Sequence, residues 1–248
     1  MLTRLVAALA VASLAIVPSV AGADQSMGQL VYSFTYSSDQ QTTARDASDS
    51  AEAVSSDVIT GGTNGQSHYE GKLNDKGTMN VDVQRKQTDG GLVVTISEQG
   101  ENTRRAPAAT CVVYGNTRVI CDPNKTVYTE EYTLLRFLGS NFVDPNQLDA
   151  NKHWAITQDG PSLAVKADYT INANNNGTMQ IGETRSLRQP GGSLTTDVQT
   201  KIAYDYKRTV PTSVDEYVTQ RHDNGVQGTS TTIYQTTLKL VSDSVASQ

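Results

Sequence analysis

Residues 194–206 read LTTDVQTKIAYDY. Every second residue from Leu194 to Tyr206 is aliphatic, aromatic or threonine, and the residues between them are mostly polar. Because successive side chains of a β-strand point to opposite faces, this alternation predicts one long strand with one buried face. A strand of this length needs a large sheet to pair with, so the segment indicates a β fold.

The same alternation recurs along the chain, first at residues 30–36. Residues 37–66 instead are rich in Ser, Thr, Asp, Gly and Gln and contain no aromatic residue, which favours a long mobile loop or a poorly ordered insertion. Turns are expected at residues 74–77 (Asn-Asp-Lys-Gly) and 88–91 (Thr-Asp-Gly-Gly). We expect further strands at residues 68–73, 79–83, 92–96, 154–156, 163–171, 213–222 and 228–241, and a hairpin at residues 109–122. The pattern predicts an all-β, mainly antiparallel fold.

The first 23 residues contain the three parts of a secretory signal. Arg4 precedes an apolar run over residues 5–17, and the small residues Ala21-Gly22-Ala23 follow. We expect cleavage after Ala23 and therefore a secreted or periplasmic protein. The apolar run is shorter than the roughly 20 residues that span a bilayer, so we do not expect an integral membrane protein.

Net charge limits the possible partners. The chain carries 20 basic and 26 acidic side chains, and loss of Arg4 with the leader lowers the formal charge from −6 to −7. Nucleic-acid binding needs a basic stripe, which this sequence does not show, so no nucleic-acid partner is expected. The chain is long enough to bury a core, and all-β domains of this size are often undivided. We therefore expect residues 24–248 to form a single domain.

Two cysteines, Cys111 and Cys121, lie in a predicted hairpin at residues 109–122. The loop of this hairpin is Gly115-Asn116-Thr117, because β-prone residues flank it on both sides. Counting outward from Asn116 places Cys111 opposite Cys121, within reach of a disulfide. An exported protein meets an oxidising compartment, which favours a structural bridge over a metal-binding or catalytic thiol.

One stretch, residues 126–138, has the period of a helix. Tyr128, Tyr132, Leu135 and Leu138 recur at spacings of four, three and three. These spacings predict one short amphipathic helix with a single apolar face.

A shift of 100 residues aligns residues 69–85 with residues 169–185, with six identical positions out of 17. Turn chemistry explains the shared Asn and Gly but not the shared Tyr, Met and Arg. Self-similarity at a fixed spacing favours a duplicated β-unit, and coincidence is the alternative. We therefore expect a first unit at residues 24–122, a helix and linker at 123–150, and a second unit at 151–248.

The expected strands present more apolar surface than one short helix covers. The sheet then either closes into a barrel or sandwich, or stays open and curves around the helix. The second arrangement resembles the half-barrel of periplasmic lipoprotein carriers and of related mycobacterial lipid-binding lipoproteins in its export signal, long antiparallel strands and covering helix. The chain contains no motif of either family, so the resemblance carries over no residue roles.

No constellation of residues predicts catalysis or a cofactor. Residues 172–183 have the spacing of a calcium loop, but Glu183 is their one carboxylate and the flanks read as strands, which favours an Asn-Gly hairpin turn. His68, His153 and His222 lie at no metal-ligand spacing. We predict no metal site, no cofactor and no catalytic residue.

The surplus of apolar strand faces favours an extracytoplasmic, non-catalytic protein that holds a lipid-like or other apolar ligand. Two alternatives stay open. One is a secreted structural or protein-interaction module with a self-packed core, and the other is an enzyme of unstated class in which His153 or His222 meets a carboxylate in a cleft. We place these residues on the ligand-binding face, the two leucines opposite the sheet: Tyr32, Phe34, Leu135, Leu138, Val165, Tyr169, Ile202 and Tyr204.

Overall fold

The structure, a computed structural model, describes residues 27–43, 68–101, 105–115, 117–138, 143, 152–160, 163–175, 177–189, 191–223 and 228–245. Its elements are β1 (Gly28–Thr43), β2 (His68–Lys86), β3 (Leu92–Gly100), β4 (Arg105–Val113), β5 (Val119–Cys121), α1 (Thr129–Leu135), β6 (His153–Asp159), β7 (Ala164–Asn175), β8 (Thr178–Arg188), β9 (Leu194–Asp205), β10 (Val210–Asp223) and β11 (Thr229–Asp243). The strands pair antiparallel throughout, which confirms the predicted fold class.

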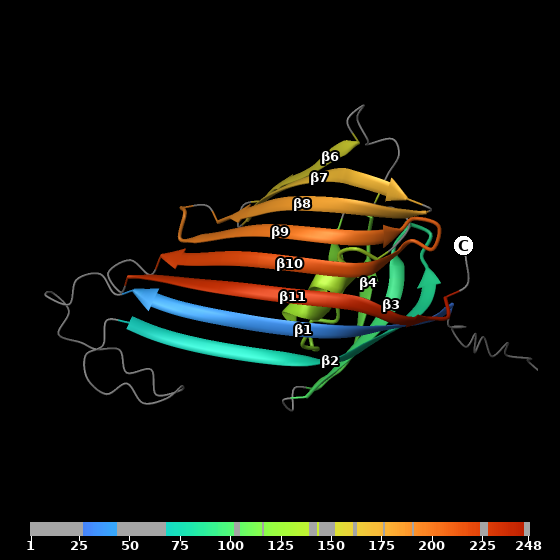
Figure 1. Ribbon diagram of the computed structural model, residues 1–248, viewed down its shortest axis with the longest axis horizontal. Helices are drawn as coiled ribbons and strands as arrows, with labels where there is room; N and C mark the ends of the chain where they lie inside the picture. The colour runs from blue at the N-terminus through green and yellow to red at the C-terminus, as the bar shows by residue number, and fades with distance from the viewer. Residues whose placement is uncertain are drawn as a thin grey trace, which may run out of the picture.

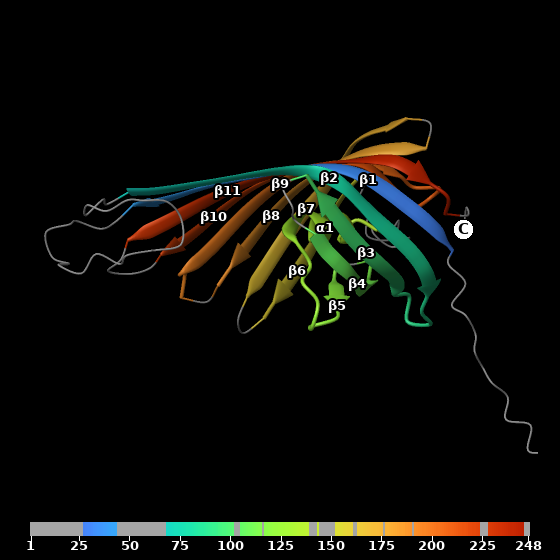
Figure 2. The same cartoon turned by 90° about the horizontal axis from the view of Figure 1, so that it is seen from below.

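One sheet contains all 11 described strands, in the order β5-β4-β3-β2-β1-β11-β10-β9-β8-β7-β6. The N-terminal β1 lies between β2 and β11, so the two ends of the described chain meet in the middle of the sheet (Figure 1). The sheet is open, with β5 and β6 at its edges, and it arches over α1 (Figure 2). Of the two arrangements that the sequence allowed, the curved open sheet is therefore the observed one.

The hydrophobic core lies in the concavity of this sheet. On β1, Leu30, Tyr32, Phe34 and Tyr36 are all buried, as their alternation predicts. They pack with the inward-facing residues of the other strands and with the leucines of α1 in one continuous cluster. Burying these side chains is the main source of stability, because apolar area removed from water contributes about 25 cal/mol per Å².

Two predictions about β1 and β2 need correction. β1 continues to Thr43, so residues 37–43 are a strand and not the start of the expected loop, and residues 44–66 lie outside the described residues. The turn expected at residues 74–77 is wrong, because Asn74 to Gly77 pair without interruption with Ser37 to Phe34. The long β1 supplies backbone partners along the whole segment, and this pairing overrides the local turn preference.

Gly77 serves close packing and not a turn. A Cβ atom at this position would lie 2.0 Å from the backbone oxygen of Gln99 on β3. The turn expected at residues 88–91 does form between β2 and β3, with Gly90 at φ 87°. The sequence therefore located one of these two glycine-containing turns correctly.

The proposed duplication is not shown by the structure. Gly177 occupies the tight connection between β7 and β8 at φ 91°, whereas its counterpart Gly77 lies inside β2. The same residue types thus take different conformations in the two copies. The domain division stays a prediction, and the signal segment at residues 1–23, with cleavage after Ala23, lies outside the described residues.

The predicted disulfide hairpin is confirmed. Cys111 is bonded to Cys121, and the ladder pairs Val112 with Ile120 and Val113 with Val119, which is the predicted register. The bridge fastens the three-residue strand β5 to β4 at one edge of the sheet. A disulfide is compatible with an exported protein.

Helix α1 is shorter than expected and is not amphipathic in the expected way. It spans seven residues, Thr129–Leu135, and Tyr132 is 40% exposed, although it was placed on the apolar face. Glu130 and Glu131 are fully buried. Because the arched sheet surrounds α1 on most sides, charged as well as apolar side chains of this segment are removed from water.

Candidate functional site

A row of eight inward-facing side chains crosses the concave face from β2 to β6, one per strand. Consecutive members are direct cross-strand partners, and all eight are at most 7% exposed. We call this set the covered row: Asp75, Tyr36, Thr236, Glu216, Thr200, Glu183, Tyr169 and Trp154. Its middle is polar, which the apolar pattern of the flanking positions did not lead us to expect.

Arg136, which directly follows α1, lies over the middle of the covered row and is 2% exposed. Its Nη1 donates to Glu183 Oε1 of β8 at 3.0 Å, and its Nη2 forms an ion pair with Glu216 Oε2 of β10. The guanidinium carbon also lies 4.7 Å from the ring centre of Phe137, a cation–π contact. One cation thus joins the helix segment to two carboxylates on different strands.

Hydroxyl groups complete the coordination of the two carboxylates. Thr200 of β9 donates to Glu183 Oε2 at 2.6 Å, and Tyr169 of β7 donates to Glu183 Oε1 at 2.9 Å. Thr133 of α1 donates to Glu216 Oε1 at 2.6 Å. A buried ion pair is tolerated when its remaining lone pairs are hydrogen-bonded, and that condition is met here. The network therefore fixes α1 against β8, β9 and β10.

The pKa values of the network follow from this geometry. Burial alone would raise the pKa of Glu183, but Arg136, Arg185 and the hydroxyl donors outweigh it and the pKa is lowered. Burial alone would lower the pKa of Arg136, but Glu183 and Glu216 raise it well above its ordinary value. Burial and the Glu183 charge raise the pKa of Tyr169. Arg136 and Glu183 are therefore both charged in the folded protein, and Tyr169 keeps its proton.

The strands continue past α1 toward the ends marked by Thr43, Arg188 and Asp223 (Figures 1 and 2). There, two further inward-facing rows follow the covered row, and we call them together the open end. The first row is Leu73, Ser38, Tyr234, Val218, Val198, Arg185, Ala167 and Ile156, and the second is Gly71, Gln40, Thr232, Gln220, Thr196, Leu187, Val165 and Gln158.

Exposure rises from the covered row outward. In the first row of the open end, Val198 and Ala167 are still buried, whereas Leu73 is 43% exposed. No member of the second row is buried. Apolar side chains such as Leu187 and Val165 are thus half-buried on a concave surface that the described residues leave partly uncovered.

Arg185 is the one charged side chain in the open end. Its strand partners on either side are Ala167 and Val198, both buried and apolar. Its Nε atom is buried and has no hydrogen-bond partner among the described residues. Burial lowers its pKa and the nearby Arg136 lowers it further, although Glu183 and Glu216 act in the opposite direction.

The structure gathers most of the predicted ligand-binding residues into the core. The following are at most 2% exposed: Tyr32, Phe34, Leu135, Leu138, Tyr169, Ile202 and Tyr204. Val165 is half-buried and lies in the open end. These residues do share the concave side: Leu135 and Leu138 belong to α1 and its flanking segment, and the other five buried ones lie on the sheet. Whether any of the eight contacts a ligand stays a prediction.

Sequence reasoning missed the polar centre of the concave face. The signal was present, because Glu183 follows Met179 and Ile181 at the strand period, and Glu216 stands between Val214 and Val218. Charged residues at apolar positions of a strand indicate a buried charge network. The sequence could not supply the partner, Arg136, because it lies 47 and 80 residues away from the two glutamates.

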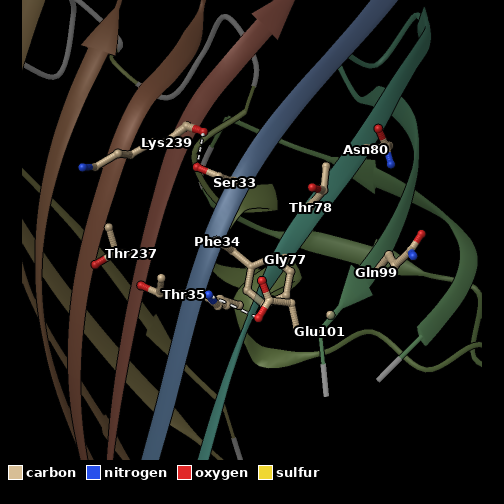
Figure 3. Close-up of a pocket in the computed structure, with 12 residues that line it drawn as sticks. Ser33, Phe34, Thr35, Gly77, Thr78, Asn80, Gln99, Glu101, Thr237 and Lys239 are labelled. Atoms are coloured by element: carbon tan, nitrogen blue, oxygen red, sulfur yellow. Dashed lines mark hydrogen bonds and ion pairs between the residues drawn. The ribbon is translucent and has the colours of Figure 1, made fainter. Parts of the chain in front are cut away.

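The convex side carries a separate polar groove of about 1230 Å³ where β3 ends against β2 (Figure 3). Its lining includes Ser33, Thr35, Thr78, Asn80 and Gln99. An exposed ion pair between Lys76 and Glu101, at 3.2 Å, closes one side. This groove is open, its outward-facing side chains are polar, and Phe34 also borders it.

For an enzyme, we expected His153 or His222 to meet a carboxylate in a cleft, and His153 does lie near a carboxylate. His153 Nε2 lies 3.5 Å from Asp168 Oδ1, and both side chains are about one third exposed. The two residues project from the convex face, because their neighbours Trp154, Ala167 and Tyr169 are buried on the concave side. Lys166 also contacts the carboxylate at 3.4 Å. The described part of the chain contains no group of three or more His, Cys, Asp or Glu able to hold a metal ion. No described helix is long and apolar enough to cross a membrane.

Comparison with known proteins adds little to this geometry. No family model matches the chain, and no curated protein matches it. Among solved structures, one of lipovitellin, titled for lipid–protein interactions, superposes with a TM-score of 0.48 and 10% identity over 91% of this chain. The superposition covers 26% of the lipovitellin chain. We therefore infer function from the residues of this chain alone.

Proposed function

We propose that this protein is an exported, non-catalytic binding protein that holds an apolar or lipid-like small molecule against the open end of its concave face. The observation that supports the proposal is the gradient of exposure along that face. Side chains under α1 are sealed, and those beyond it, including Leu73, Leu187 and Val165, are partly accessible on an inward-curving surface. Concave, mainly apolar surfaces with few polar groups are the usual form of small-molecule sites.

The site proposed here lies beyond most of the ligand-binding residues predicted from the sequence. Tyr32, Phe34, Ile202 and Tyr204 are buried in the core, so a ligand contacts them only if the residues packed over them move. The buried Arg136 network opposes such a movement, because separating Arg136 from its carboxylates leaves charges unpaired in the interior. The open end offers apolar surface without that cost.

Binding is tested with the neutral fluorescent probe N-phenyl-1-naphthylamine and by mass spectrometry of organic extracts of the purified protein. We expect saturable probe binding that Leu73→Asp weakens about tenfold, the effect of losing one buried leucine contact. Tyr217→Asp is the matched control, since Tyr217 is 40% exposed but lies on the convex face. Absence of both a probe signal and an extracted lipid from the unmodified protein would refute the proposal.

A second candidate function is supported by the solid centre of the concave face. The covered row and the core beside it are fully packed, as a self-packed protein-interaction or structural module requires. Such a module would use an exposed edge, and β6 offers Ala155, Thr157 and Gln158 as exposed side chains. The same titration separates the two functions, because a module without a ligand site gives no saturable probe binding.

A further inference from the structure

From the position of Arg185 we infer that the ligand of the open end is an anionic amphiphile, whose head group pairs with this guanidinium while its apolar chain lies on the neighbouring aliphatic side chains. This inference rests on the proposed function and specifies its ligand class. The geometry that carries it is a cation set among apolar residues on a partly uncovered concave surface.

The first step concerns the surroundings of Arg185. It stands directly between Ala167 and Val198 in the sheet, and Val165 and Leu187 lie in the next row. A charged side chain in such surroundings is costly unless it is paired and hydrogen-bonded. The apolar neighbours therefore make Arg185 a place where a partner is favoured.

The second step concerns the carboxylates nearby. Glu183 and Glu216 act on Arg185 through space, but their oxygen atoms are engaged by Arg136, Thr133, Thr200 and Tyr169. The structure shows no ion pair between Arg185 and either glutamate, and Nε of Arg185 has no hydrogen-bond partner among the described residues. Neither glutamate thus neutralises Arg185 by a direct ion pair, so its charge can pair with an anion that comes from outside the protein.

The third step concerns the chemistry of the partner. A guanidinium presents parallel N–H donors that match the oxygen atoms of a carboxylate or a phosphate. An amphiphile with such a head and an apolar tail satisfies both the cation and the half-buried aliphatic surface. A neutral lipid would satisfy the aliphatic surface but offer no opposite charge to the guanidinium.

The test compares cis-parinaric acid with its methyl ester, two fluorescent ligands that differ in the charge of the head. The unmodified protein is expected to bind the acid more tightly, and Arg185→Gln should weaken acid binding about tenfold or more while leaving ester binding unchanged. Arg185→Lys keeps the charge but loses the planar pair of N–H donors, so its affinity for the acid should lie between those of the unmodified protein and of Arg185→Gln. Lys201→Gln is the control, because it removes the same charge from the convex face of the neighbouring strand.

Competition with laurate and with dodecyl phosphate distinguishes a carboxylate head group from a phosphate head group. The competitor whose affinity falls more in Arg185→Gln carries the head group that resembles the natural ligand more closely. If the Arg185→Gln protein is folded, as judged by circular dichroism, and its affinities for the acid and for both competitors equal those of the unmodified protein, the inference is overturned. Equal binding of ester and acid by the unmodified protein overturns it too, while the proposed function stands. Failure of all these ligands to bind the unmodified protein overturns both.

Discussion

Arg136 and Glu183 form a salt bridge of 3.0 Å in which neither side chain is more than 2% exposed. The two residues are 47 positions apart, one directly after the helix and one in the middle of β8. Because the same guanidinium also reaches Glu216 on β10, the contact fixes where the helix segment lies across three adjacent strands. Helix placement, and with it the extent of the open end, depends on this contact.

Replacement of Arg136 by Met is expected to destabilise the protein by about 3–5 kcal/mol, because two carboxylates are left in the interior without their cation. Urea unfolding followed by circular dichroism measures the loss. Arg188→Met is the control: the Arg188 side chain is 45% exposed, so its ion pair with Asp197 should contribute at most about 1 kcal/mol. An Arg136→Met protein as stable as the control variant would show that the network does not hold the fold.

Acid should weaken the fold partly through Glu183. Its pKa is lowered from the usual 4.5 in the folded state, so the folded protein binds this proton less readily than the unfolded chain does. The resulting stabilisation is complete above about pH 4.5 and is lost as the pH falls through the folded-state pKa.

Unfolding free energies measured between pH 7 and pH 2.5 should therefore decline less steeply below pH 4.5 for Glu183→Gln than for the unmodified protein. The variant is also less stable at neutral pH, which does not affect the comparison of slopes. Asp197→Asn, at an exposed ion pair, should keep the slope of the unmodified protein. If the stability of Glu183→Gln declined with pH as steeply as that of the unmodified protein, Glu183 would not contribute to the acid sensitivity of the fold.

Reduction of the Cys111–Cys121 bridge is expected to cost about 2–3 kcal/mol, the loop-closure entropy of a short loop. The comparison is between denaturation midpoints with and without a thiol reductant. A Cys111→Ser/Cys121→Ser variant, insensitive to the reductant, serves as the control. If reduction leaves the midpoint unchanged, the edge strand β5 does not depend on its covalent link.

Gly77→Ala should destabilise the protein by about 1–3 kcal/mol, because the added carbon meets a backbone oxygen that cannot rotate away. The added Cβ atom would lie 2.0 Å from the backbone oxygen of Gln99. Gly182→Ala is the matched control in another strand, since its Cβ would lie 3.1 Å from the flexible amide of Asn172. Equal stability of the two variants would mean that β2 and β3 are not held as closely as the structure places them.

Local alternation was enough to locate most strands, including β1, β3, β9 and β10, because a strand with one buried face has an apolar residue at every second position of the sequence. The hairpin register of Cys111 and Cys121 also followed from counting, since a three-residue loop centred on Asn116 places these two cysteines, ten positions apart, opposite each other. By contrast, residues 74–77 carry turn-forming residues, and only the presence of β1 alongside them makes a strand.

The sequence by itself determined an all-β antiparallel protein with a disulfide-bonded hairpin and one short helix, because side-chain alternation, cysteine spacing and helical period are patterns within short stretches of the chain. Tertiary structure decided that the sheet stays open and that Arg136 meets Glu183 and Glu216. It also decided that Arg185 stands among aliphatic side chains beyond the cover of α1. Those relationships join residues from distant strands, and their register depends on how the whole sheet curves, which no local pattern encodes.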